Sequence, residues 1–121
     1  VSHCKPGAVI VITVPNVAHL ATRIQLFFGQ FKYVDRGILD RTHLRFFTQS
    51  TAMELVEHAG LHLAQITVTP TPVELVFPSI MKSMAGNALL SFLANFTKVF
   101  PRVFGYQFVM ICKIADSAES P

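Results

Sequence analysis

The stretch Ala8-Val9-Ile10-Val11-Ile12-Thr13-Val14 decides the fold that we predict for this chain. Lys5-Pro6-Gly7 precedes it as a turn signal, and Pro15-Asn16 closes it. An unbroken apolar run rich in β-branched residues, rather than an alternating one, is typical of a strand covered on both faces. Such strands occur in sheets with helices on each side, so the segment predicts an α/β architecture.

The chain after this strand alternates between helical and loop patterns. Apolar spacing predicts a short helix within residues 17–31, and residues 32–47 form a polar, charged loop. Thr48 is the expected N-cap of a second helix. Gly60 stands where a left-handed C-terminal cap belongs.

The second half of the chain adds two strands and a helical connection. Residues 61–69 alternate well enough to predict a strand, despite one irregularity. Asn87 is the expected cap of an apolar helix that Pro101 stops, and residues 106–114 form the last strand. We expect residues 115–121 to be a disordered tail.

Composition indicates one domain with a large amount of apolar surface to bury. The chain has 121 residues, of which 51% are hydrophobic and 14% charged, with eleven Phe and no Trp. This low charge suggests apolar surface that is covered by a missing half-domain, a partner or a membrane surface. The net charge of +3 is small and scattered, so we expect no nucleic-acid partner.

Neither membrane insertion nor secretion is expected. The start of the chain has no signal-peptide pattern, and the uncharged stretch of residues 83–97 is shorter than the ~20 apolar residues of a bilayer span. Cys4 and Cys112 lack metal-ligand spacing, so we interpret them as reduced thiols of a cytoplasmic protein.

Three segments resemble class I S-adenosylmethionine-dependent methyltransferases. Residues 5–16 resemble the family's "LKPGG-lvi-vPN" segment, and residues 106–111 its closing strand. Asp40-Arg41-Thr42-His43-Leu44-Arg45-Phe46-Phe47-Thr48, followed by a helix that ends in Ala59-Gly60, resembles "D-x-T-H-x-R-F-F-T … AGF". The ordered combination is much more specific than any one of these segments.

The resemblance implies the C-terminal part of a Rossmann-like methyltransferase sheet. It implies about three strands and three helices in residues 1–114, with the last strand antiparallel and central. The Gly-rich loop and the acidic residue that hold S-adenosylmethionine in the family have no counterpart here. The cofactor would therefore be bound by a missing N-terminal half, and this chain alone would be inactive and would shape the side for a small-molecule acceptor.

Candidate site residues follow from this arrangement. Ligands of open α/β sheets lie beyond the carboxyl ends of the parallel strands, so Asn16 either contacts substrate or merely ends its strand. Asp40 and Arg41 either bind substrate or stabilise their loop. His43 is the candidate catalytic base, because histidine titrates near neutral pH, or it hydrogen-bonds the backbone. Methyl transfer often needs only positioning, so a dedicated base is not required.

Two further interpretations complete the prediction. His58 and His62 are four residues apart, but Gly60 ends the helix between them, so we expect no metal site.

The alternative function is a non-catalytic α/β interaction module that associates through its apolar surface. The resemblance also implies that residues 8–14 would expose an edge normally paired with a missing strand, through which the chain would self-associate.

Overall fold

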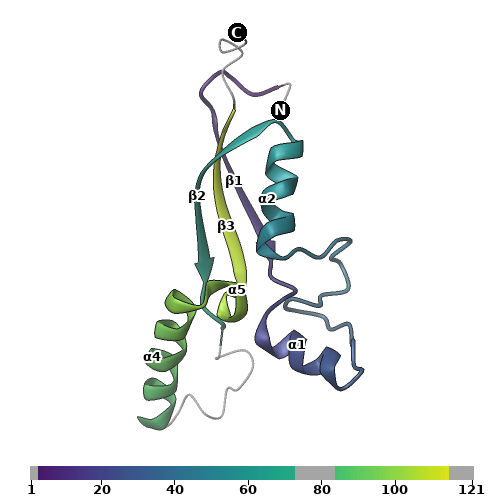
Figure 1. Cartoon of the computed structure of the whole chain (residues 1–121), viewed down its shortest axis with the longest axis vertical. Helices are drawn as coiled ribbons and strands as arrows, with labels where there is room; N and C mark the ends of the chain where they lie inside the picture. The colour runs from purple at the N-terminus through teal and green to yellow at the C-terminus, as the bar shows by residue number, and fades with distance from the viewer. Residues whose placement is uncertain (1–2, 73–83, 115–121) are drawn as a thin grey trace.

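The computed structural model describes residues 3–72 and 84–114 and shows a small α/β unit. Its sheet contains β1 (Val9–Pro15), β2 (Leu61–Thr69) and β3 (Gln107–Ile114) in the order β1-β3-β2. Both outer strands are antiparallel to β3 (Figure 1). The α/β class and the central, antiparallel last strand are therefore confirmed.

The register aligns the strands so that β1 and β2 finish at the same end of the sheet. Ile10 lies opposite Cys112, and Pro15 and Thr69 both lie opposite Gln107. The irregularity expected in the second strand is a shift of register between Leu63 and Gln65. Because β1 and β2 run in the same direction, their carboxyl ends meet beside the start of β3.

Local capping explains the first two helices. Helix α1 (Leu20–Phe27) is shorter than the predicted range 17–31 and is followed by Gly29, which has φ +68°. Helix α2 (Gln49–His58) begins with a capping box between Thr48 and Thr51. Gly60, with φ +70°, follows it as predicted.

Two helices connect the second strand to the third. Helix α4 spans Met84–Val99 and the short helix α5 spans Pro101–Phe104. Asn87 was expected to cap α4, and this prediction is wrong: the helix is already formed at Met84, so Asn87 lies inside it. Pro101 ends α4 as predicted and opens α5, where its missing N–H costs nothing.

Within the described ranges, no helix combines the length and the apolar character that a bilayer crossing requires. The expected disordered tail, residues 115–121, lies outside the described residues.

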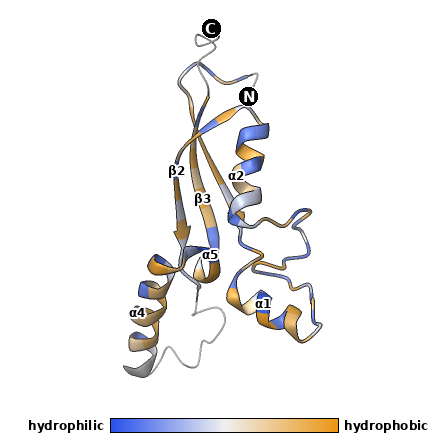
Figure 2. Cartoon of the chain, viewed as in Figure 1, coloured by the Kyte–Doolittle hydropathy of each residue, from blue (hydrophilic) through white to orange (hydrophobic). Residues whose placement is uncertain are grey.

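The core lies between α2 and one face of the sheet. Phe108, Met110 and Cys112 of β3 are completely buried there, against Ala52 and Val56 of α2. Colouring by hydropathy shows the apolar character of the strands beside the mixed surface of α2 (Figure 2). One amphipathic helix therefore covers one face of the sheet.

The opposite face corrects the prediction for residues 8–14. Val9 and Val11 are 58% and 61% exposed, whereas Ile10 and Ile12 between them pack toward the core. The expectation that helices cover both faces is therefore wrong for the described residues. The reason is that α2 packs on one face, while α1, α4 and α5 lie near the end of the sheet (Figure 1). β1 is an edge strand, paired in the described structure with β3 alone.

Candidate functional site

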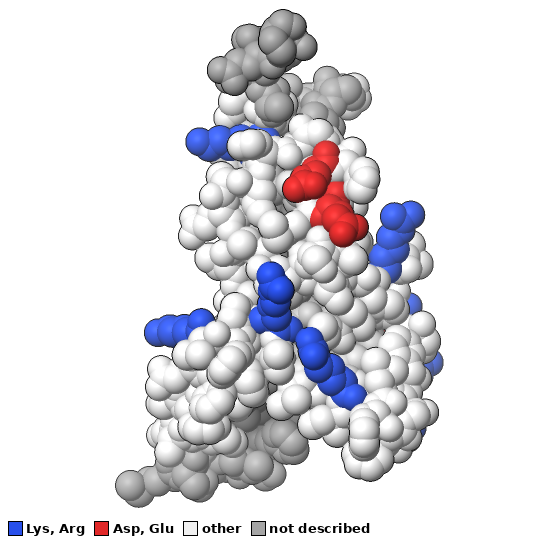
Figure 3. Space-filling model, viewed as in Figure 1, with Lys and Arg blue, Asp and Glu red and all other residues white. Residues whose placement is uncertain are grey.

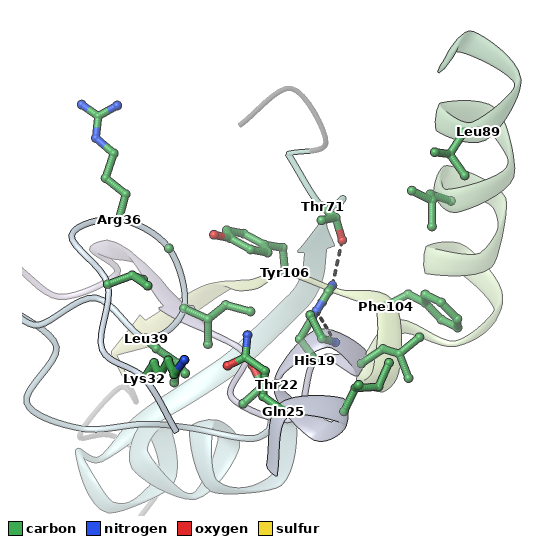
Figure 4. A pocket seen from close by; sticks show the side chains of 17 residues that line it. His19, Thr22, Gln25, Lys32, Arg36, Leu39, Thr71, Leu89, Phe104 and Tyr106 are labelled. Atoms are coloured by element: carbon green, nitrogen blue, oxygen red, sulfur yellow. Dashed lines mark hydrogen bonds between the residues drawn. The ribbon is translucent and has the colours of Figure 1, made fainter. Parts of the chain in front are cut away.

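A cavity of about 580 Å³ lies beyond the carboxyl ends of β1 and β2. His19 follows β1, Thr71 follows β2 and Tyr106 precedes β3, and all three line the cavity (Figure 4). Small-molecule sites typically measure 300–1,000 Å³ and are concave and mostly apolar. This is also the end of an α/β sheet at which ligands are expected.

The walls of the cavity are mainly hydrocarbon and come from four segments. Helix α1, the loop after it, α4 and α5 supply the apolar side chains, which are Leu20, Ala21, Ile24, Val34, Ile38, Leu39, Leu89, Leu93 and Phe104. Ile38 and Leu39 are themselves buried, at 7% and 5% exposure, so the loop is fixed to the fold. The cavity therefore has a packed wall on the loop side.

His19 joins two walls and is held in one tautomer. Its Nδ1 accepts a hydrogen bond from the backbone N–H of Ala21 at 3.2 Å, which caps α1. The proton of the neutral ring is then on Nε2, which donates to Thr71 Oγ1 at 2.8 Å. Burial lowers the pKa of His19 and favours this neutral form. Both ring nitrogens are engaged, so His19 is a positioning residue rather than a proton acceptor.

Tyr106 connects the sheet to the loop after α1. Its ring meets His19 edge-on, with centroids 5.8 Å apart. A Cβ on Gly37, which has φ +110°, would lie 2.8 Å from the Tyr106 hydroxyl, so the loop needs glycine there. Burial raises the pKa of Tyr106, more than a backbone hydrogen bond from Ile38 lowers it. The phenol is therefore neutral at physiological pH.

The charged residues among the described lining of the cavity are basic. Lys32 and Arg36 both line it and are exposed, and no carboxylate does so among the described residues. Elsewhere on the face shown in Figure 3, basic side chains are spread over the surface rather than gathered in a patch.

Asn16, a predicted substrate-binding residue, is completely buried beside the cavity. Its Nδ2 donates to the backbone oxygens of Arg102 at 3.0 Å and Gly105 at 2.8 Å, and its Oδ1 accepts from Ala18 N–H at 3.0 Å. These bonds fix the end of β1 to α5. In this conformation both amide hydrogens are used by the protein, and a substrate contact stays a prediction.

The predicted polar loop cluster forms separate local interactions. Asp40 Oδ1 accepts from Thr42 N at 2.8 Å and Thr42 Oγ1 at 2.7 Å, and the backbone bond contributes most to lowering the pKa of Asp40. Arg41 pairs with Asp35 at 3.6 Å, not with Asp40, and both partners are largely exposed. Such an exposed pair adds little to stability.

One ring nitrogen of His43 is hydrogen-bonded to the backbone of its own loop, and the other is not. Its Nδ1 donates to the backbone oxygen of Ile38 at 3.0 Å, so a neutral ring carries its free lone pair on Nε2. Its backbone N–H also donates to Asp40 O at 3.1 Å, so the two residues belong to one turn. His43 and Asp40 are not among the residues that line the cavity. Their catalytic and substrate-binding roles stay predictions.

The cavity residues His19, Thr71, Tyr106 and Gly37 were missed by the sequence analysis. The position of His19, between a strand end and a helix start, was the available signal for a cap. Thr71 and Tyr106 had only their places beside strand ends. The pairing of three strands is needed to bring them together.

Comparison with known proteins gives no identification: no protein-family model matches this chain, and neither does any curated protein.

Proposed function

We propose that this chain is the acceptor-side, C-terminal part of an S-adenosylmethionine-dependent methyltransferase, and that its cavity binds the small-molecule acceptor. The observation that carries the proposal is the position of the cavity, beyond the carboxyl ends of β1 and β2. The resembling segments adjoin its lining in the chain: residues 5–16 lead to His19, and residues 40–48 continue the loop of Leu39. Residues 106–111 begin with Tyr106, which itself lines the cavity.

Sheet topology supports the same proposal. The resemblance implies a last strand that inserts antiparallel between the two strands before it, and β3 occupies that place. The exposed edge of β1 is where the resemblance would put a preceding parallel strand. The exposed Val9 and Val11 would then be covered by the missing part of the domain.

The composition of the cavity lining supports a donor site elsewhere. Among the described residues no acidic side chain lines the cavity, where a ribose diol would need one, and its one glycine, Gly37, lies against the Tyr106 hydroxyl. We therefore assign the donor to the missing N-terminal half.

This chain's own contribution would be to hold the acceptor. The apolar walls bind its hydrocarbon part and exclude water, and the bond between His19 and Thr71 fixes the position of α1 relative to the end of β2. His43 does not line the cavity, so its role as a proton acceptor rests on the resemblance alone and needs a substrate group that reaches outside the cavity to Nε2. The proposal depends on the positioning of the acceptor and not on His43, because methyl transfer often needs no dedicated base.

The test compares this chain with the protein encoded by the complete reading frame. Calorimetry should detect no binding of S-adenosylmethionine to the chain alone, and micromolar binding would contradict the proposal. The complete frame should encode an upstream strand with a Gly-rich turn, and its product should transfer labelled methyl groups to a pool of small molecules. A frame that begins near Val1, or a complete protein that binds no donor, would overturn the assignment.

The exposed apolar side of β1 favours a second candidate, the non-catalytic interaction module. Val9 and Val11 lie on an open face next to the half-buried Val109 and Ile111 of β3. A module of this kind would associate through that surface while its cavity played no part. A complete reading frame that lacks a donor-binding half would favour it over the methyltransferase.

A further inference from the structure

We propose that the cavity takes an amphipathic organic anion, with a hydrocarbon body between α1 and α4 and a negatively charged group facing Lys32 and Arg36. This inference rests on the proposed function and adds the chemical class of the acceptor to it. It concerns binding, so it can be tested without methyl transfer.

The hydrocarbon body follows from the walls. Leu20 and Ile24 of α1 remain 37% and 49% exposed, although they line the cavity. Leu89 and Leu93 line it from α4. A bound alkyl or ring system would remove these side chains from water, and burial of apolar surface is the main source of affinity in such sites.

The negative charge follows from the titratable groups that line the cavity. His19 is neutral because it is buried and its Nδ1 accepts a backbone hydrogen bond. Tyr106 is a neutral phenol. This leaves Lys32 and Arg36 as the charged groups among the described residues of the lining. The described residues contain one ion pair, Arg41 with Asp35, so neither cation has a carboxylate partner among them.

A hydrogen-bond donor lies beside the apolar walls. The neutral phenol of Tyr106 lines the cavity, and its O–H is by its chemistry a hydrogen-bond donor. Gln25 and Thr22 add neutral polar groups on α1. The ligand should therefore carry oxygen acceptors as well as its charge, which a carboxylate or phosphate ester does.

The first experiment varies the charge of a probe at constant chain length. Calorimetry on this chain would compare decanoate, decan-1-ol and decyltrimethylammonium. We expect decanoate to bind about tenfold more tightly than the cation, with the alcohol between them. No binding of any probe, or a cation that binds as well as decanoate, would overturn the inference.

The second experiment varies the protein. Lys32→Glu should weaken decanoate binding about tenfold and leave decan-1-ol unchanged. Lys113→Glu makes the same charge change on the exposed far end of β3 and should leave both affinities unchanged. Equal losses in the two variants would mean that net charge, not this cavity, governs binding.

The third experiment fills the cavity. Leu93→Trp puts a large ring into its wall and should abolish binding of all three probes, whereas Phe92→Trp, on the exposed side of α4, should not. Thermal unfolding checks that both variants fold. If Leu93→Trp does not fold, Lys32→Glu still tests the site independently. Undiminished binding by a folded Leu93→Trp would contradict the inference. Probe binding without methyl transfer by the complete protein would sink the proposed function alone.

Discussion

The core under α2 and the cavity end of the sheet are built on different physical principles. Under α2, apolar side chains interlock without polar groups: Phe108, Met110 and Val56 are almost completely buried. At the cavity end, buried polar groups are added to the apolar ones: Asn16, His19 and Thr22 are buried there, and the first two are fixed by hydrogen bonds to distant segments. The core under α2 therefore supplies stability by burial, whereas the cavity end supplies a defined shape.

The largest difference in stability between the core under α2 and the cavity end should come from Phe108→Ala. Removing this fully buried ring leaves a cavity in the core and should lower the free energy of unfolding by about 3–5 kcal/mol. Phe104→Ala, in the half-buried cavity wall, should cost about 1–2 kcal/mol. Urea denaturation measures both. Equal losses would mean that the cavity end is packed as tightly as the core.

The second effect concerns polar burial. Asn16→Ala leaves two backbone oxygens and one N–H without partners in a buried site and should cost about 2–3 kcal/mol. Asn95→Ala, on the exposed surface of α4, is the matched control and should change stability by less than about 0.5 kcal/mol. If Asn16→Ala were equally harmless, the hydrogen bonds to α5 would not hold this end together.

The third effect is a dependence on pH. Because the pKa of His19 is lowered in the folded state, the unfolded chain binds more protons between that pKa and about 6.5. Stability should therefore fall as the pH drops below about 6.5 and level off below the folded pKa. His19→Gln should remove this part of the slope in denaturation curves from pH 8 to 5. His62→Gln, at an exposed position of β2, should keep it.

The smallest effect concerns the open edge of β1. If residues 8–14 pair between copies, Val11→Lys should shift the mass measured by light scattering toward the monomer. Thr67→Lys places the same charge on the open face at the other outer strand and should have less influence. A wild-type chain that stays monomeric at high concentration would contradict self-association.

Sequence patterns predicted α2 and its core better than the cavity end for a physical reason. The Thr48 cap, the spacing of Ala52 and Val56, and Gly60 are local signals, and each was confirmed. The length of the apolar run identified β1. It could not show that Val9 and Val11 face water, because that depends on whether another segment of the chain covers them. His19, Thr71 and Tyr106 meet only through strand pairing, so no local pattern assembles them.

The most direct test of the central claim is methyl transfer by the complete protein with a filled cavity. We predict that the wild type and Phe92→Trp transfer labelled methyl groups to the same acceptor at similar rates. Leu93→Trp should lower kcat/KM about 100-fold, because the acceptor is displaced from its position. Undiminished transfer by a folded Leu93→Trp enzyme would show that the acceptor lies elsewhere and would contradict this account.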